Sequence, residues 1–162
     1  IARRLIERGV RFVQLFTKNQ YWDHHGGIVT GLPASCRKVD QPAAALVKDL
    51  KQRGLLDTTV VHWGGEMGRL PVIQNETNIG RDHNTYGFTM WVAGGGFRTG
   101  TYGETDEFGH HAVENTVNHY DYHATLLHLF GLEAQLLTYE QNGREQTLID
   151  GQPATVVEGL LA

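Results

Sequence analysis

Hydrophobic and polar positions follow a helical period in three segments of the chain. Each segment is followed or closed by a glycine, which is typical of a helix end: residues 1–9, 41–54 and 122–131. Asp40 and Asp121 stand just before the second and third segments, and we expect them to act as N-caps. The pattern therefore predicts three helices.

A second set of segments has the composition and alternation of β-strands. These segments are "VRFVQLF", "TTVVHWGG" and "FTMWVAGGG", at residues 10–16, 58–65 and 88–96. An Asn-Gly pair within residues 137–149 predicts a β-hairpin. Because strands alternate with helices, we expect an α/β fold with a mostly parallel sheet flanked by helices, in one domain over residues 1–162.

Composition limits the classes of partner. The 162 residues are 40% hydrophobic and carry a net charge of −4, which offers no basic surface for nucleic acid. We find no hydrophobic run long enough for a transmembrane segment. Cys36 is the single cysteine, so an internal disulfide is excluded.

Residues able to do chemistry gather in three short motifs near the predicted strands. The motifs are "YWDHHGG", "GGEMGR" and "GRDHN", which contain Asp23, His24, His25, Glu66, Arg69, Arg81, Asp82 and His83. At the carboxyl edge of a parallel sheet such motifs can converge. Imidazole and carboxylate ligands together suit zinc, manganese or iron. Asp-His pairs are also common on solvated loops, so a metal or acid–base site and a surface hydrogen bond both remain open.

Five stretches of the sequence resemble one bacterial family. They are "RGVRFVQLF", "WDHHGG", "DLKQRGLLDTTVVHWGGEMGRLP", "GRDHNTYGFTMWVAGGGFRTG" and "DEFGHHAVENTVNHYDYHATLLHLFGL". They look like the carboxy-terminal half of the family called domain of unknown function 1501, which is sulfatase-like and abundant in planctomycetes. That family resembles the alkaline phosphatase superfamily. The resemblance implies an alkaline phosphatase/sulfatase-like fold, present here as an incomplete C-terminal portion, and a periplasmic or secreted location.

The resemblance also implies roles for particular residues. The implied metal ligands are Asp23, His25, Glu66 and His83, with Asp82 a partner or second ligand. Arg69 and Arg81 could hold the oxygens of a sulfate or phosphate ester, although both could equally be solvated surface charges. The implied activity is metal-dependent hydrolysis of such an ester with zinc, calcium, magnesium or manganese. The nucleophile would come from an amino-terminal half, so no catalytic residue is assigned and residues 1–162 alone are expected to be inactive.

One departure from the superfamily pattern keeps a second hypothesis open. Gly64 and Gly65 stand where sulfatases carry a metal-binding Asp-His pair. The fold could therefore serve as a non-catalytic, secreted carbohydrate- or partner-binding module. An isomerase like the cofactor-independent phosphoglycerate mutases is a third, weaker resemblance.

Overall fold

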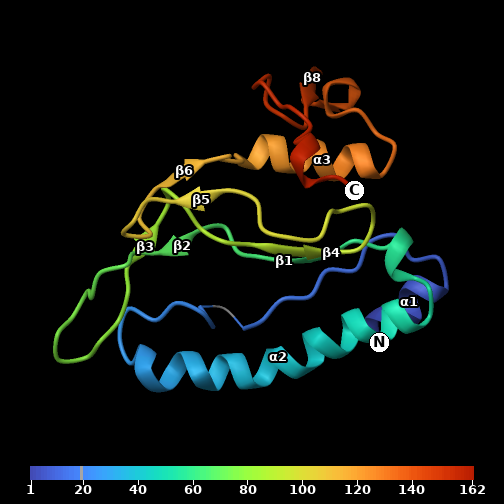
Figure 1. Cartoon of the computed structure of the whole chain (residues 1–162). Coiled ribbons are helices and arrows are strands. Elements are labelled where there is room, and N and C mark those ends of the chain that lie inside the picture. The colour runs from blue at the N-terminus through green and yellow to red at the C-terminus, as the bar shows by residue number, and fades with distance from the viewer. Residues whose placement is uncertain (19) are drawn as a thin grey trace.

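The computed structural model describes residues 1–18 and 20–162 as helices, short strands and long connections (Figure 1). The α-helices are α1 (Ala2–Glu7), α2 (Ile28–Gln52) and α3 (His119–Leu129). Short 3-10 helices cover Leu56–Thr58, Ala134–Leu136 and Glu158–Leu160. The strands are β1 (Val61–Trp63), β2 (Gly68–Arg69), β3 (His83–Asn84), β4 (Trp91–Ala93), β5 (Glu104–Thr105), β6 (Ala112–Glu114), β7 (Thr138–Gln141) and β8 (Arg144–Thr147).

The strands form four separate antiparallel pairs: β1–β4, β2–β3, β5–β6 and β7–β8. The predicted parallel sheet, and with it the alkaline phosphatase-like fold, is therefore wrong for the described part of the chain. The reason lies in the connection between β1 and β4. It contains no crossover helix, which a parallel pair needs, and instead turns back through β2 and β3.

This antiparallel path determines which motifs meet. Residues that follow β1 and residues that precede β4 lie at the same end of the β1–β4 pair, because the two strands run in opposite directions. The chain continues this pairing in β2–β3, where Arg69 is the register partner of His83. The motifs "GGEMGR" and "GRDHN" are thus neighbours by antiparallel pairing and not because both leave a parallel sheet.

Residues 10–16, expected as a strand, form no strand in the structure. Within the described residues, no backbone–backbone hydrogen bond involves residues 11–17. Phe12, Leu15 and Phe16 are exposed to solvent. The sequence has the alternation of a strand, but the described chain offers no neighbouring strand to it, and the prediction is wrong for this structure.

Helix α2 begins earlier than the expected helix at residues 41–54. Its N-cap is Gly27, and Pro33 and Pro42 both lie inside it, so Asp40 is a mid-helix residue and not an N-cap. Ile28 N–H is satisfied outside the helix, by donating to the Ile79 carbonyl at 3.0 Å. A proline inside a helix removes one backbone donor and crowds the preceding turn, yet α2 continues through both. The predicted end of the helix before Gly54 is confirmed, and Gly54 has the left-handed conformation.

The core of the carboxy-terminal part lies around α3 and the β7–β8 hairpin. Ala124, Ala134, Ile149 and Ala154 form its buried cluster. Asn118 caps α3 by accepting from Asp121 N–H, so the expected cap at Asp121 lies three residues too late. The hairpin is confirmed, with positive φ at both Asn142 and Gly143.

A short hydrogen bond joins α3 to the strands. Tyr122 O–H lies 2.6 Å from Nδ1 of His62 on β1. Burial raises the pKa of Tyr122 to about 12, and burial followed by the nearby His123 lowers the pKa of His62. Both shifts favour the neutral forms, so this pair is a structural contact between neutral groups.

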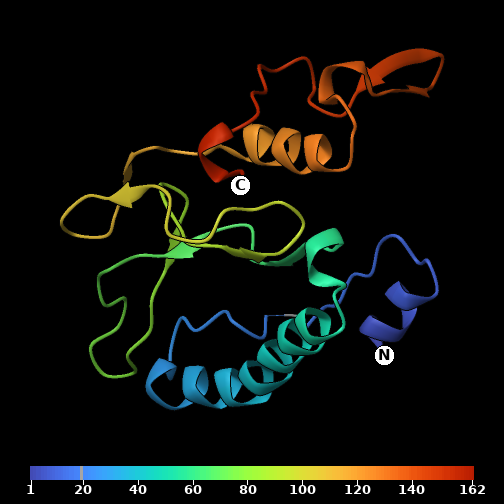
Figure 2. The ribbon, with the colours of Figure 1, turned by 45° about the vertical axis from the view of Figure 1, so that its right-hand side comes forward.

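The β1–β4 pair lies between the long helices, with α2 along one side and α3 along the other (Figures 1 and 2). The accessible surface is 12002 Å², against about 8,100 Å² expected for a compact monomer of this mass. Large parts of the element faces are therefore open to solvent. None of the helices in the described residues is long and apolar enough to cross a membrane.

Candidate metal centre

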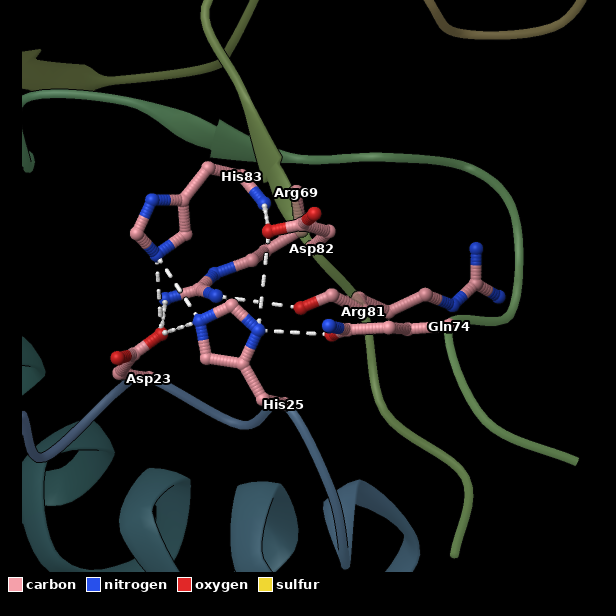
Figure 3. Close-up of polar contacts among 7 residues, drawn as sticks. All are labelled: Asp23, His25, Arg69, Gln74, Arg81, Asp82 and His83. Atoms are coloured by element: carbon pink, nitrogen blue, oxygen red, sulfur yellow. Dashed lines mark hydrogen bonds and ion pairs between the residues drawn. The ribbon is translucent and has the colours of Figure 1, made fainter. Parts of the chain in front are cut away.

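Three of the side chains singled out in the sequence meet at one point between α2 and β3 (Figure 3). Asp23 Oδ1 lies 2.9 Å from His25 Nε2 and 3.1 Å from His83 Nε2. The two Nε2 atoms are 3.3 Å apart. Asp23, His25 and His83, which we call the 23–25–83 cluster, thus direct three potential metal ligands toward one another, although His83 lies 60 positions from Asp23 and 58 from His25 in sequence.

The segment that carries Asp23 and His25 is held against the loop before β3. Arg81 N–H donates to the His24 carbonyl at 2.9 Å, next to the bond from Ile28 to Ile79. Gly80 is buried between these contacts, and a Cβ atom there would overlap the His25 carbonyl. Only glycine allows the two backbones to approach this closely, so Gly80 helps to bring His25 within reach of His83.

Pairing and a local hydrogen bond position His83. Its register partner Arg69 places it at the edge of β3, and its backbone N–H donates to Asp82 Oδ1 at 2.8 Å. The same Asp82 oxygen lies 3.7 Å from His25 Nδ1. Asp82 therefore contacts both histidines from outside the cluster, and none of its contacts is with the two Nε2 atoms.

Gln74 fixes the orientation of His25. Its Oε1 lies 2.7 Å from His25 Nδ1, on the side of the ring that faces away from the cluster. A glutamine Oε1 only accepts hydrogen bonds, so we assign the proton of neutral His25 to Nδ1. The Nε2 lone pair then faces Asp23 and His83, which is the arrangement found when the distal ring nitrogen of a metal-bound histidine is hydrogen-bonded.

Arg69 neutralises the carboxylate of the cluster. Its guanidinium lies 2.6 Å from Asp23 Oδ1, and it also donates to the Arg81 carbonyl at 3.2 Å. Arg69, followed by His83, lowers the pKa of Asp23 below the ordinary aspartate value. Asp23 is therefore ionised at neutral pH and can act as a ligand without first losing a proton.

The distances within the cluster fit a small divalent ion. Ligands of a tetrahedral ion with bonds of about 2.0–2.1 Å lie about 3.4 Å apart, and neighbouring ligands of an octahedral ion lie about 2.9 Å apart. The three observed separations, 2.9, 3.1 and 3.3 Å, fall between these limits. The histidine side chains are 40% and 43% exposed, so water or a ligand can reach the open side.

The other expected site residues lie around the cluster or apart from it. Glu66 is exposed and does not join the three converging ligand atoms. Arg81 donates to the Leu70 carbonyl at 3.1 Å, and Figure 3 shows its guanidinium directed away from the 23–25–83 cluster. Gln74 was not expected from the sequence, because it lies in a long polar loop without periodicity or motif.

A second histidine–carboxylate group lies in the loop between β5 and β6. Asp106 accepts the backbone N–H groups of Phe108, His110 and His111 at 2.8–3.2 Å. The Asp106 Oδ2 also lies 3.3 Å from His111 Nδ1. The backbone bond from His110, with further bonds from His111 and Phe108, lowers the pKa of Asp106. This carboxylate closes a loop.

Comparison with known proteins identifies a family. The search found no match among curated proteins or solved structures. Residues 1–161 match the family described as "Protein of unknown function (DUF1501)". The resemblance seen in the sequence motifs thus extends over nearly the whole chain, and the protein belongs to the DUF1501 family.

Proposed function

We propose that the protein binds a divalent transition metal through Asp23, His25 and His83 and that this centre serves the hydrolysis of a sulfate or phosphate ester. The observation that carries the proposal is the convergence of Asp23 Oδ1 with the two Nε2 atoms within 3.3 Å. Arg69 offsets the charge of Asp23, and the two imidazole Nε2 atoms beside Asp23 Oδ1 could act with it as three ligands of one ion.

The ligand set favours zinc, manganese or iron over the other ions considered. Two imidazole nitrogens and one carboxylate oxygen resemble the three-ligand sites of catalytic zinc and of non-haem iron. Calcium and magnesium prefer shells made of oxygen ligands. Of the cations expected from the sequence, zinc and manganese therefore fit these residues, and calcium and magnesium do not.

The charges around the cluster favour an anionic substrate. Asp23 and Asp82 contribute two negative charges and Arg69 one positive charge, so a divalent ion gives the group a net positive charge. A bound ion would polarise ester oxygens and acidify a bound water. Arg69 is 28% exposed and can donate to a non-bridging oxygen beside the ion. Gln74 would keep His25 oriented while its Nε2 remains on the metal.

Metal binding is tested first, by titrating purified protein with Zn²⁺ and Mn²⁺ in a calorimeter and by elemental analysis. We expect one ion per chain. In His25→Ala and His83→Ala the site loses a direct ligand and binding should fall below detection. Stoichiometric zinc in both variants would contradict the assignment.

Hydrolysis is tested with the longest form of the protein that folds, on phenyl phosphate and phenyl sulfate with added metal. We expect turnover of one of the two esters that is lost in His83→Ala. Metal and anion binding without turnover of either ester would contradict the hydrolase proposal. That result would favour the alternative, a non-catalytic binding module.

A further inference from the structure

A cleft adjoins the 23–25–83 cluster. Its volume is about 660 Å³, within the usual size of small-molecule sites. One wall is the face of α2 that includes Ala43 and Val47, and the other is the β1–β4 pair with Trp63 and Trp91. The lining is mostly apolar, although water can enter it freely.

Arg69 connects the cleft to the cluster. It lines the cleft together with Glu66 and Met67, and its guanidinium lies 2.6 Å from Asp23 Oδ1. An anion held by the metal and Arg69 would therefore sit at the mouth of the cleft. The rest of such a molecule would extend between α2 and the strands.

Aromatic rings make up much of the cleft wall. Trp63 and Trp91 are register partners on β1 and β4, with their rings parallel within 3° and centroids 6.1 Å apart. Trp22 meets Trp63 edge to face at 5.9 Å. Trp91 keeps 39% of its surface exposed. Indole faces that remain open in this way bind flat apolar rings by offset stacking or edge contact.

We propose that this cleft is the subsite for the organic group of an anionic ester and that this group presents a flat apolar ring face. The inference rests on the proposed metal centre, which supplies the anion site at the mouth. Both an aryl group and the carbon face of a sugar ring have the required shape. The walls supply the apolar contact, and Glu66 at the rim can accept a hydrogen bond from a hydroxyl or amino group.

The test uses two non-hydrolysable probes that share the anion and differ in the ring. Phenylphosphonate and methylphosphonate are titrated into zinc-loaded protein, with binding followed by calorimetry and tryptophan fluorescence. We expect phenylphosphonate to bind about 10-fold more tightly and to change the tryptophan emission. The phosphonate analogues of glucose 6-phosphate and glycerol 3-phosphate, in which a carbon atom replaces the ester oxygen, form the second pair. This pair shows whether a sugar ring gains the same advantage.

Two variants remove the subsite without touching the cluster. Trp91→Ala deletes one ring, and Ala43→Phe fills the cleft from α2, which keeps the test valid if the tryptophan is needed for folding. Both variants should bind methylphosphonate with normal affinity and lose the tighter binding of phenylphosphonate. Phe130→Ala, at the exposed C-cap of α3 and outside the cleft lining, is the matched control and should retain the tighter binding of phenylphosphonate.

The outcomes separate this inference from the proposed function. Equal affinity for the probes of both pairs, with normal zinc and methylphosphonate binding, would overturn the ring subsite and leave the metal centre standing. A ring advantage that survives in both Trp91→Ala and Ala43→Phe would overturn it as well. Absence of zinc binding would overturn both proposals together.

Discussion

The 23–25–83 cluster and the Asp106 loop contain the same residue types, an aspartate with two histidines, but they are built in opposite ways. In the cluster, ligands from separate segments turn their ring nitrogens toward one carboxylate oxygen. In the loop, the carboxylate accepts backbone N–H groups from residues no more than five positions away. The first arrangement gathers three potential ligand atoms from distant segments, whereas the second uses the carboxylate to close a turn.

The difference shows that residue type alone does not identify a metal site. "WDHH" and "DEFGHH" contain the same residue types. Asp106 is held by donors within its own loop, so its oxygens are already satisfied. Asp23 instead contacts side chains from distant segments, Arg69 and His83. An ion could bind between the ligand atoms of Asp23, His25 and His83.

The largest expected difference between the two groups is in metal affinity. His83→Ala removes a proposed ligand, and we expect zinc affinity to fall by more than the roughly 100-fold that the loss of an outer contact typically costs. His111→Ala is the matched control and should change zinc affinity by less than about 3-fold. Calorimetric titration of both variants measures this, with circular dichroism as the check on folding. Equal losses would mean that the two groups are not functionally distinct.

A smaller effect is expected for Gln74, which contacts His25 but lies outside the proposed ligand set. Gln74→Ala should lower zinc affinity by about 10- to 100-fold, because His25 loses the acceptor that fixes its tautomer. Gln74→Glu retains an acceptor oxygen and should restore most of the affinity. Competition with a colourimetric chelator gives these constants. Unchanged affinity in Gln74→Ala would show that Gln74 does not orient the histidine.

The smallest effect concerns Asp106 and appears in stability instead of metal binding. Its pKa is lowered in the folded protein, so its contribution to stability is present above the ordinary aspartate pKa of about 3.9 and is lost as the pH falls below that value. Asp106→Asn should flatten this part of the pH dependence and leave zinc affinity unchanged. Urea unfolding between about pH 6 and pH 3 measures it. An unaltered pH profile would contradict the role given to this carboxylate.

Local signals in the sequence predicted local structure well. The Asn142-Gly143 pair predicted the hairpin because both residues accept positive φ, and Gly54 marked the end of α2. The parallel sheet was wrong because alternation identifies a strand but not its partner or direction. The early start of α2 was missed because Pro33 and Pro42 are ordinarily read as breaks, although the helix passes through both.

The residues of the candidate site could be predicted from the sequence only in part. Asp23, His25 and His83 could be selected by residue type, and the structure brings their ligand atoms together. Their convergence depends on the approach of two backbones at Gly80 and on the pairing of β2 with β3, which are long-range features. Gln74 could not be found because its role arises only from where its loop folds.

The most direct test of the metal centre observes the ring nitrogens themselves. Long-range ¹H–¹⁵N spectra of uniformly ¹⁵N-labelled protein are recorded during titration with Zn²⁺, with resonances assigned from His25→Gln and His83→Gln. We predict that the Nε2 signals of His25 and His83 shift together at one equivalent of zinc, while those of His110 and His111 stay in place. Zinc-dependent shifts at His110 and His111, with His25 and His83 unchanged, would contradict a metal centre at the 23–25–83 cluster.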